Sequence, residues 1–225
     1  MTTKTLALLE AIKKDIEGGA YNVLPDRYGA ICDLINACKD DLAKKAAKAA
    51  GKTDLLKACK SILKSAGKGC NKALHGVTTI ENRSYVCDGY RIISFPAGAV
   101  DLPGLPDNVK PLELNKILEK ARASYTDTIA LPDAAFLASD IKVLKASEKA
   151  AGRKPAHINA HFGNIAFNAE FLLDMLRATG ANTGYISGPK APVYIANNDN
   201  DIECMLLPVH VATTEPRDMT LYPVY

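Results

Sequence analysis

The chain has 225 residues, of which 48% are hydrophobic and 24% are charged, and its formal net charge is +3. These fractions are typical of soluble globular proteins and exclude a chain that is disordered throughout. No run of about 18 apolar residues is available to cross a bilayer, and Glu10, Asp15 and Glu17 stand where a signal peptide needs apolar residues. We therefore expect a cytoplasmic protein with no membrane partner.

The first 50 residues are predicted to form a helical extension. Residues 3–17 have leucines and isoleucines at helical spacing and end at Gly18-Gly19, which is a stop signal for a helix. A second helix is expected from about residue 26 to residue 38. The stretch DLAKKAAKAAGK that follows has high helix propensity but little apolar bulk, so an exposed helix and a linker are both open.

Positive charge is concentrated between Lys39 and Lys72, where ten lysines stand against three aspartates. Such a block suits nucleic acid or another polyanion, although lysine-rich helices are also often merely solvated. A helix is predicted from a cap at Thr53 through LLKACKSILKSAGKG, with one apolar face for a core. The lysines that fall in one narrow wedge on the opposite side are Lys57, Lys60, Lys64 and Lys68.

Two strand-like runs follow this helix, at residues 77–80 and 84–95, with a turn at Glu81-Asn82-Arg83. The segment from residue 96 to residue 111 is rich in proline and glycine and cannot sustain regular pairing, so it is predicted to be a long connector. It divides the remaining sequence into two halves.

The second half begins with a predicted helix at 112–123, a short strand at 128–131 and a helix at 133–152. HINAHFGNIAF is then predicted to be a strand, and NAEFLLDMLRATG a helix with Asn168 as its N-cap and Gly180 just past its end. YISGPKAPVYI indicates a further strand.

The segment from Ser187 to Val211 has the pattern of a β-hairpin, because two apolar runs flank the turn-forming residues 197–201. Each half therefore has the same order: an amphipathic helix, a strand, a polar turn and a strand. LLKACKSILKSA and VTTIENRSYVCDGYRII correspond to FLLDMLRATG and PVYIANNDNDIECMLLPV. This weak repeat predicts an α+β domain in which one sheet carries two helices on one face.

The second half resembles the closing part of the last domain of the bacterial DNA polymerase III beta subunit family, the sliding clamps. The residues that carry the resemblance are FNAEFLLDMLRATG, ISGPKAPVYI and MLLPVHV, which occur in the family's order and spacing. The run from Tyr85 to Arg91 is similar to the threonine-aspartate-glycine-hydrophobe strand of clamp domains. The resemblance is closest over residues 156–211, weaker over 53–95 and absent over 1–50.

The resemblance implies a DNA-clamp-like domain whose helices line a channel with basic side chains, so that phosphates are neutralised and bases are not read. It places Lys57, Lys60, Lys64 and Lys68 where a clamp helix faces duplex DNA. The second helix departs from this pattern, since its polar face carries Glu170, Asp174 and Arg177.

The length of the chain also departs from the family. Clamp rings contain six such domains and this chain has room for about one, so a ring would need a homo-oligomer. Shortened relatives of this kind occur in phages and mobile elements, which suggests a phage-related protein.

Candidates for chemistry are few. His157 and His161 have the spacing of a helical metal pair but lie in a predicted strand, and Asp199-Asn200-Asp201 lacks the calcium-loop pattern. The six cysteines form no CxxC pair and fall in helix-like and strand-like patterns, where a reduced cysteine acts as a small apolar residue. We therefore expect no catalytic residues, no metal and no cofactor.

We predict three parts: a helical extension at 1–50, a clamp-like α+β domain at 51–211 and a C-terminal tail at 212–225. The leading functional hypothesis is a non-enzymatic clamp-like protein of DNA replication that binds duplex DNA backbone or replication proteins. The alternative is a clamp-fold module for protein contacts that does not bind DNA, with the N-terminal helices as its partner or oligomer surface.

Overall fold

A computed structural model describes residues 3–19, 25–197, 199, 201–210 and 220–225. The chain divides into two compact units, residues 1–53 (unit 1) and residues 54–225 (unit 2). Our predicted boundary stood after residue 50.

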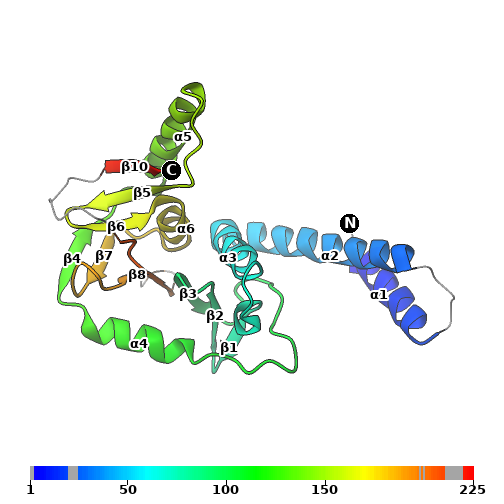
Figure 1. Cartoon of the computed structure of the whole chain (residues 1–225). Coiled ribbons are helices and arrows are strands. Elements are labelled where there is room, and N and C mark those ends of the chain that lie inside the picture. Colours follow the sequence, from blue (N-terminus) through cyan, green and yellow to red (C-terminus); the bar gives the residue numbers. More distant parts are fainter. Residues whose placement is uncertain (1–2, 20–24, 198, 200, 211–219) are drawn as a thin grey trace. The chain divides into compact units, whose positions relative to one another are not determined.

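Unit 1 is a pair of helices, α1 (Thr3–Glu17) and α2 (Pro25–Ala49), shown in blue in Figure 1. The helix predicted at 3–17 is confirmed. The predicted second helix and the alanine-lysine stretch behind it are one continuous helix, because alanine and lysine both favour helix and no stop signal separates them. The two helices run antiparallel, since Lys39 Nζ lies 2.8 Å from Glu10 Oε1 and Tyr28 donates a 2.5 Å hydrogen bond to Glu17.

Unit 2 is built on a seven-stranded sheet with the order β1-β2-β3-β9-β8-β7-β4. Its neighbouring strands are antiparallel, and their bounds are β1 (Thr78–Ile80), β2 (Arg83–Cys87), β3 (Arg91–Pro96), β4 (Asp127–Ala130), β7 (Thr183–Ile186), β8 (Val193–Asn197) and β9 (Ile202–Leu206). A smaller antiparallel sheet has the order β10-β5-β6, with β5 (His157–Phe162), β6 (Ile165–Asn168) and β10 (Thr220–Val224). The predicted α+β class is confirmed.

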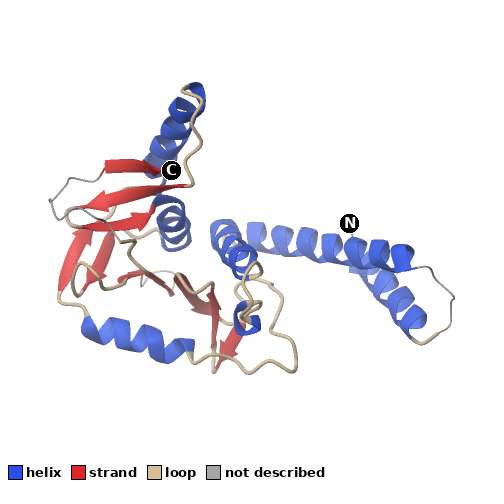
Figure 2. Ribbon diagram, in the orientation of Figure 1, coloured by secondary structure: helices blue, strands red, loops and turns tan. Residues whose placement is uncertain are grey.

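The helices of unit 2 are α3 (Thr53–Ala66), α4 (Leu114–Ser124), α5 (Ala134–Ala150) and α6 (Ala169–Thr179), with a short 3₁₀ helix, η1 (Lys72–Leu74) (Figure 2). Successive strand residues face opposite sides of the large sheet. Ile93 and Cys204 thus join a core with α3, α5 and α6, whereas Ile92 and Met205 join a second core with α4. The predicted arrangement of two helices on one face is present as α3 and α6, and α4 covers the other face.

Two predicted strands are hairpins. The run at 84–95 is divided into β2 and β3 by the turn Asp88-Gly89-Tyr90, in which Gly89 has a φ of +91°. HINAHFGNIAF is divided into β5 and β6 at Gly163, where φ is +58°. Each turn contains a hairpin signal, Asp88-Gly89 in the first and Gly163-Asn164 in the second, which the prediction of single strands did not use.

The C-terminal residues also differ from the prediction. Thr220–Val224, assigned to a tail at 212–225, form β10, which pairs with β5 along its whole length. The hairpin predicted between Ser187 and Val211 is present as β8 and β9, which pair from Val193↔Leu206 to Asn197↔Ile202. Residues 198, 200 and 211–219 of the hairpin turn and the tail lie outside the described residues.

Candidate nucleic-acid interface on helices α3 and α6

Helix α3 has one face in the core and one face that carries lysines. Leu55, Cys59 and Ile62 are each 3% exposed or less. On the other side Lys57 and Lys64 are exposed and Lys60 is half-buried. Because the apolar face fixes the rotation of the helix, the lysine face is held on the surface of unit 2.

Lys68 does not belong to the helix. Helix α3 ends at Ala66, and Lys68 follows in an exposed turn between Gly67 and Gly69. The predicted helical wedge therefore contains three lysines, with the fourth beyond its end. Glycine has a low helix propensity and is common where helices stop, which explains the earlier end.

Lys57 makes an ion pair with Asp54 one turn earlier on the same helix. The distance from Nζ to Oδ1 is 3.0 Å, and the two side chains are 68% and 53% exposed. Exposed pairs of this kind contribute less than about 1 kcal/mol, so Asp54 does not remove Lys57 from contact with a stronger anion.

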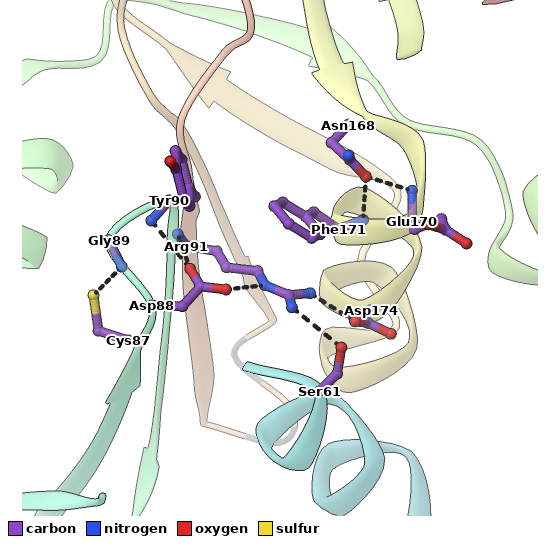
Figure 3. Close-up of polar contacts among 10 residues, drawn as sticks. All are labelled: Ser61, Cys87, Asp88, Gly89, Tyr90, Arg91, Asn168, Glu170, Phe171 and Asp174. Carbon is purple, nitrogen blue, oxygen red and sulfur yellow. Dashed lines mark hydrogen bonds and ion pairs between the residues drawn. The ribbon is translucent and has the colours of Figure 1, made fainter. Parts of the chain in front are cut away.

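Behind the lysine face, one buried arginine connects three elements (Figure 3). Arg91, at the start of β3, is 1% exposed. Its Nε donates to Asp88 Oδ2 at 2.9 Å, its Nη1 donates to Asp174 Oδ2 of α6 at 2.6 Å, and its Nη2 donates to Ser61 Oγ of α3 at 3.1 Å. A single guanidinium therefore links α3, α6 and the turn between β2 and β3.

The turn that positions Arg91 is fixed by the same aspartate. Asp88 Oδ1 accepts hydrogen bonds from the backbone N–H groups of Tyr90 and Arg91, at 3.0 and 3.1 Å. The guanidinium carbon also lies 4.0 Å from the centroid of the Phe171 ring, where the negative ring face favours a cation. Arg91 thus has charged, polar and aromatic partners, as a buried charge requires.

The polar face of α6 is less negative than its sequence suggests. Asp174 is paired with Arg91, and Glu170 forms an ion pair with Lys145 of α5. Arg177 is exposed on the same helix. Both carboxylates of this face therefore have cationic partners, which offsets their repulsion of an anion near α3.

Comparison with known proteins gives structural similarity alone. No family model matches the sequence, and no curated protein matches it. Among solved structures, a putative DNA polymerase III beta subunit from Eubacterium rectale aligns with a TM-score of 0.46 and 15% identity, over 70% of this chain and 64% of that one. A DNA polymerase sliding clamp from Caulobacter crescentus aligns with a TM-score of 0.46 and 13% identity, over 71% of this chain and 64% of that one. An H. pylori beta clamp aligns with a TM-score of 0.45 and 14% identity, over 70% of this chain and 64% of that one.

These clamps are longer than the matched region, since this chain spans 64% of the length of each. With TM-scores below 0.5 and identities of 15% or less, the matches describe a likeness of fold and assign no site residues.

Sequence reasoning did not single out Ser61, Asp88 or Arg91 as a site. One signal was present: Arg91 is the single charged residue of the strand RIISFP, and it follows the turn Asp88-Gly89-Tyr90. A charge at a core position needs buried partners: Asp88 is three residues away in sequence, whereas the second carboxylate, Asp174 of α6, is far away in sequence.

The other predicted candidates lie elsewhere. His157 and His161 are on β5, and His161 is buried against the ring of Tyr222 on β10, with ring centroids 4.8 Å apart. Among the described residues, no group of three or more histidine, cysteine, aspartate or glutamate side chains could hold a metal ion. None of the helices described is both long and apolar enough to cross a membrane.

Four of the six cysteines are buried. Burial raises the pKa of Cys87 to about 11 and also raises the pKa values of Cys59 and Cys204. Because the thiolate is the reactive form, these three residues act as small apolar side chains of the core.

Proposed function

We propose that unit 2 is a non-enzymatic, clamp-like domain that binds the backbone of duplex DNA through Lys57, Lys60, Lys64 and Lys68. The observation that carries the proposal is the single lysine face of α3, whose opposite face is anchored in the core. The resemblance of the sequence to sliding clamps supports the same function. A role in DNA replication, replication proteins as partners and a phage-related origin rest on that resemblance.

Lysine is suited to this kind of contact. Its ammonium group is a compact charge on a flexible stem, so it can follow phosphates without fixed geometry. If four lysines each neutralise one phosphate, the logarithm of the binding constant should fall with the logarithm of the salt concentration with a slope of about −3.6. Such binding is independent of sequence, which a protein that slides along a duplex requires.

Encirclement of DNA would need several copies, because unit 2 supplies one clamp-like domain. We propose that β1 and β4, the edge strands of the large sheet, are where such copies would meet. Both are short, at three and four residues. Short edge strands limit unwanted pairing while leaving backbone groups for a specific partner.

A second candidate is a protein-contact module without DNA binding. The observation in its favour is that α6 has no lysine, so the second helix of the pair adds Arg177 as its single basic residue. If this function is correct, the lysine face of α3 is a solvated surface.

Charge reversal on α3 and at Lys68, just beyond its end, tests the proposal. The variant Lys57→Glu, Lys60→Glu, Lys64→Glu and Lys68→Glu is compared with the wild type in fluorescence anisotropy with a labelled duplex, from low to physiological salt. We expect at least a 100-fold loss of affinity at low salt, and a loss of the steep salt dependence, because about four phosphate contacts disappear.

A matched control separates local contact from total charge. Lys110, Lys120, Lys142 and Lys149 are exposed lysines outside α3, and their reversal changes the net charge equally. We expect the control to lose less than 10-fold in affinity. Absence of wild-type binding at low salt, or equal losses in the two variants, would favour the contact module instead.

A further inference from the structure

We propose that unit 1 is a self-association element, in which the α1–α2 hairpin of one chain packs against the hairpin of a second copy of this chain. The inference concerns Thr3–Glu17 and Pro25–Ala49 and does not rest on DNA binding by unit 2.

The first observation is that the hairpin leaves its own apolar residues incompletely covered. None of the residues of α1, from Thr3 to Glu17, is buried, although Leu6, Leu9, Ile12 and Ile16 recur at helical spacing. They are half-buried. Isolated helices of about 12–15 residues are marginal in water and depend on packing of their apolar face, so a helix like α1 gains stability from a further partner.

The second observation is an exposed apolar side on the hairpin. Leu8 of α1 is 63% exposed and Leu34 of α2 is 45% exposed. Ile12 and Ile31, near them on the same two helices, are half-buried. Exposed leucines on both helices provide a stripe that a partner can cover.

The polar contacts between the helices are on the other side. Each residue turns the helix by about 100°, so Leu8 projects about 160° away from Glu10, and Leu34 about 140° away from Lys39. Glu10 and Lys39 form the ion pair that joins α1 to α2. The hairpin therefore has a side with the ion pair and a side with leucines, as expected for half of a four-helix bundle.

Charge favours a second copy as the partner. On the leucine side of α2, Arg27 and Asp41 are exposed and stand seven residues before and after Leu34, within about 20° of it around the helix. Two copies of α2 that run antiparallel, with their Leu34 residues at a two-fold axis, place Arg27 of each opposite Asp41 of the other. Helix α1 has three lysines and three acidic residues, so it does not oppose the association. The two-fold arrangement is the commonest in homo-oligomers.

The test is the solution mass of the full chain without DNA. Light scattering is measured over a range of micromolar concentrations for the wild type and for the variant Leu8→Glu and Leu34→Glu. We expect a wild-type mass of at least twice the chain mass of 24.1 kDa. The variant should have the chain mass, with its dissociation constant raised by at least 100-fold, since buried charges replace interface leucines.

The control is Phe136→Glu with Val143→Glu, which changes two exposed apolar residues of α5 in unit 2. It should keep the wild-type mass. Far-UV circular dichroism shows whether the hairpin variant keeps its helices, and Leu8→Ala with Leu34→Ala, which favours helix, should also weaken the association. A monomeric wild type, or an oligomer that both leucine variants leave intact, overturns the proposal.

Discussion

Arg91 shows how one residue decides the relation between two helices. Its side chain and that of Asp88 are 1% and 0% exposed, and its second carboxylate partner, Asp174, is 22% exposed. The third partner of the Arg91 side chain is the hydroxyl of Ser61 on α3. Because the guanidinium is planar and its donors are fixed in direction, it sets the separation of α3 and α6 more closely than a lysine could.

Removal of this arginine should therefore be costly. We expect Arg91→Leu to destabilise unit 2 by roughly 3–5 kcal/mol, because the charge of Asp88 would remain buried without its partner. The measurement is the urea-unfolding midpoint followed by near-UV tyrosine signal, since seven of the nine tyrosines lie in unit 2.

Arg83→Leu is the matched control. Arg83 also pairs with an aspartate, Asp201, but their side chains are 25% and 63% exposed. Its loss should cost roughly 1–2 kcal/mol, because the exposed ion pair contributes little and the hydrogen bond from Nε to Ser94 Oγ, at 2.8 Å, is also removed. Equal midpoints for the two variants would contradict the role given to Arg91.

At the level of elements, α6 has the clearest terminal signals. The Asn168 side chain accepts hydrogen bonds from the backbone N–H groups of Glu170 and Phe171, both at 3.1 Å. Gly180 ends the helix in the left-handed region with a φ of +67°. Both residues were predicted from the sequence, because capping depends on neighbours within one turn.

Replacement of this cap should have a measurable cost. We expect Asn168→Ala to lower the free energy of unfolding by about 1 kcal/mol, because two N–H groups lose their acceptor. Asn168→Asp keeps an acceptor and should remain within a few tenths of a kcal/mol of the wild type. Chemical denaturation of the two variants decides the matter, and an unaffected Asn168→Ala would show that the cap is unimportant here.

Local signals thus predicted α1, α3, α5 and α6, and the lysine face of α3, since each depends on residues close in sequence. What the sequence did not reveal depends on distant partners. The pairing of β10 with β5, and the ion pair of Arg91 with Asp174, join residues that no local pattern connects. The position of α4 over the second sheet face is of the same kind, since it requires Ile92 and Met205 to be adjacent.

On the scale of the whole molecule, the C-terminal residues stabilise unit 2 through a charged contact. Glu148 of α5 is 4% exposed, and it accepts hydrogen bonds from Arg153, at 2.7 and 2.8 Å, and from the Tyr225 hydroxyl. The hydrogen bonds from Arg153, which have the largest effect, and from Tyr225 hold the pKa of Glu148 below its ordinary value of 4.5. Stability from this contact is therefore present above the unfolded pKa and is lost as the pH falls through the lowered folded pKa.

The expected result is a pH-dependent difference between the wild type and Glu148→Gln. The wild type should be more stable at pH 6, and the difference in melting temperature should shrink as the pH falls below about 4.5 and through the lowered folded pKa, where the glutamate becomes protonated. Thermal unfolding at several pH values measures it. A difference that stays constant over this range would mean that the ionised carboxylate does not stabilise the fold.

The centre of the large sheet has a consequence for synthesis of the protein. Strand β3 pairs with β9, which joins residues 91–94 to residues 203–206. At about 5–20 residues per second, a ribosome takes roughly 6–20 s to make the residues between them. During that time β3 can pair with β2 on one side, but its other edge has no partner and could pair with a wrong strand. The central strand pair therefore leaves the newly made first half open to wrong strand pairing until the second half is complete.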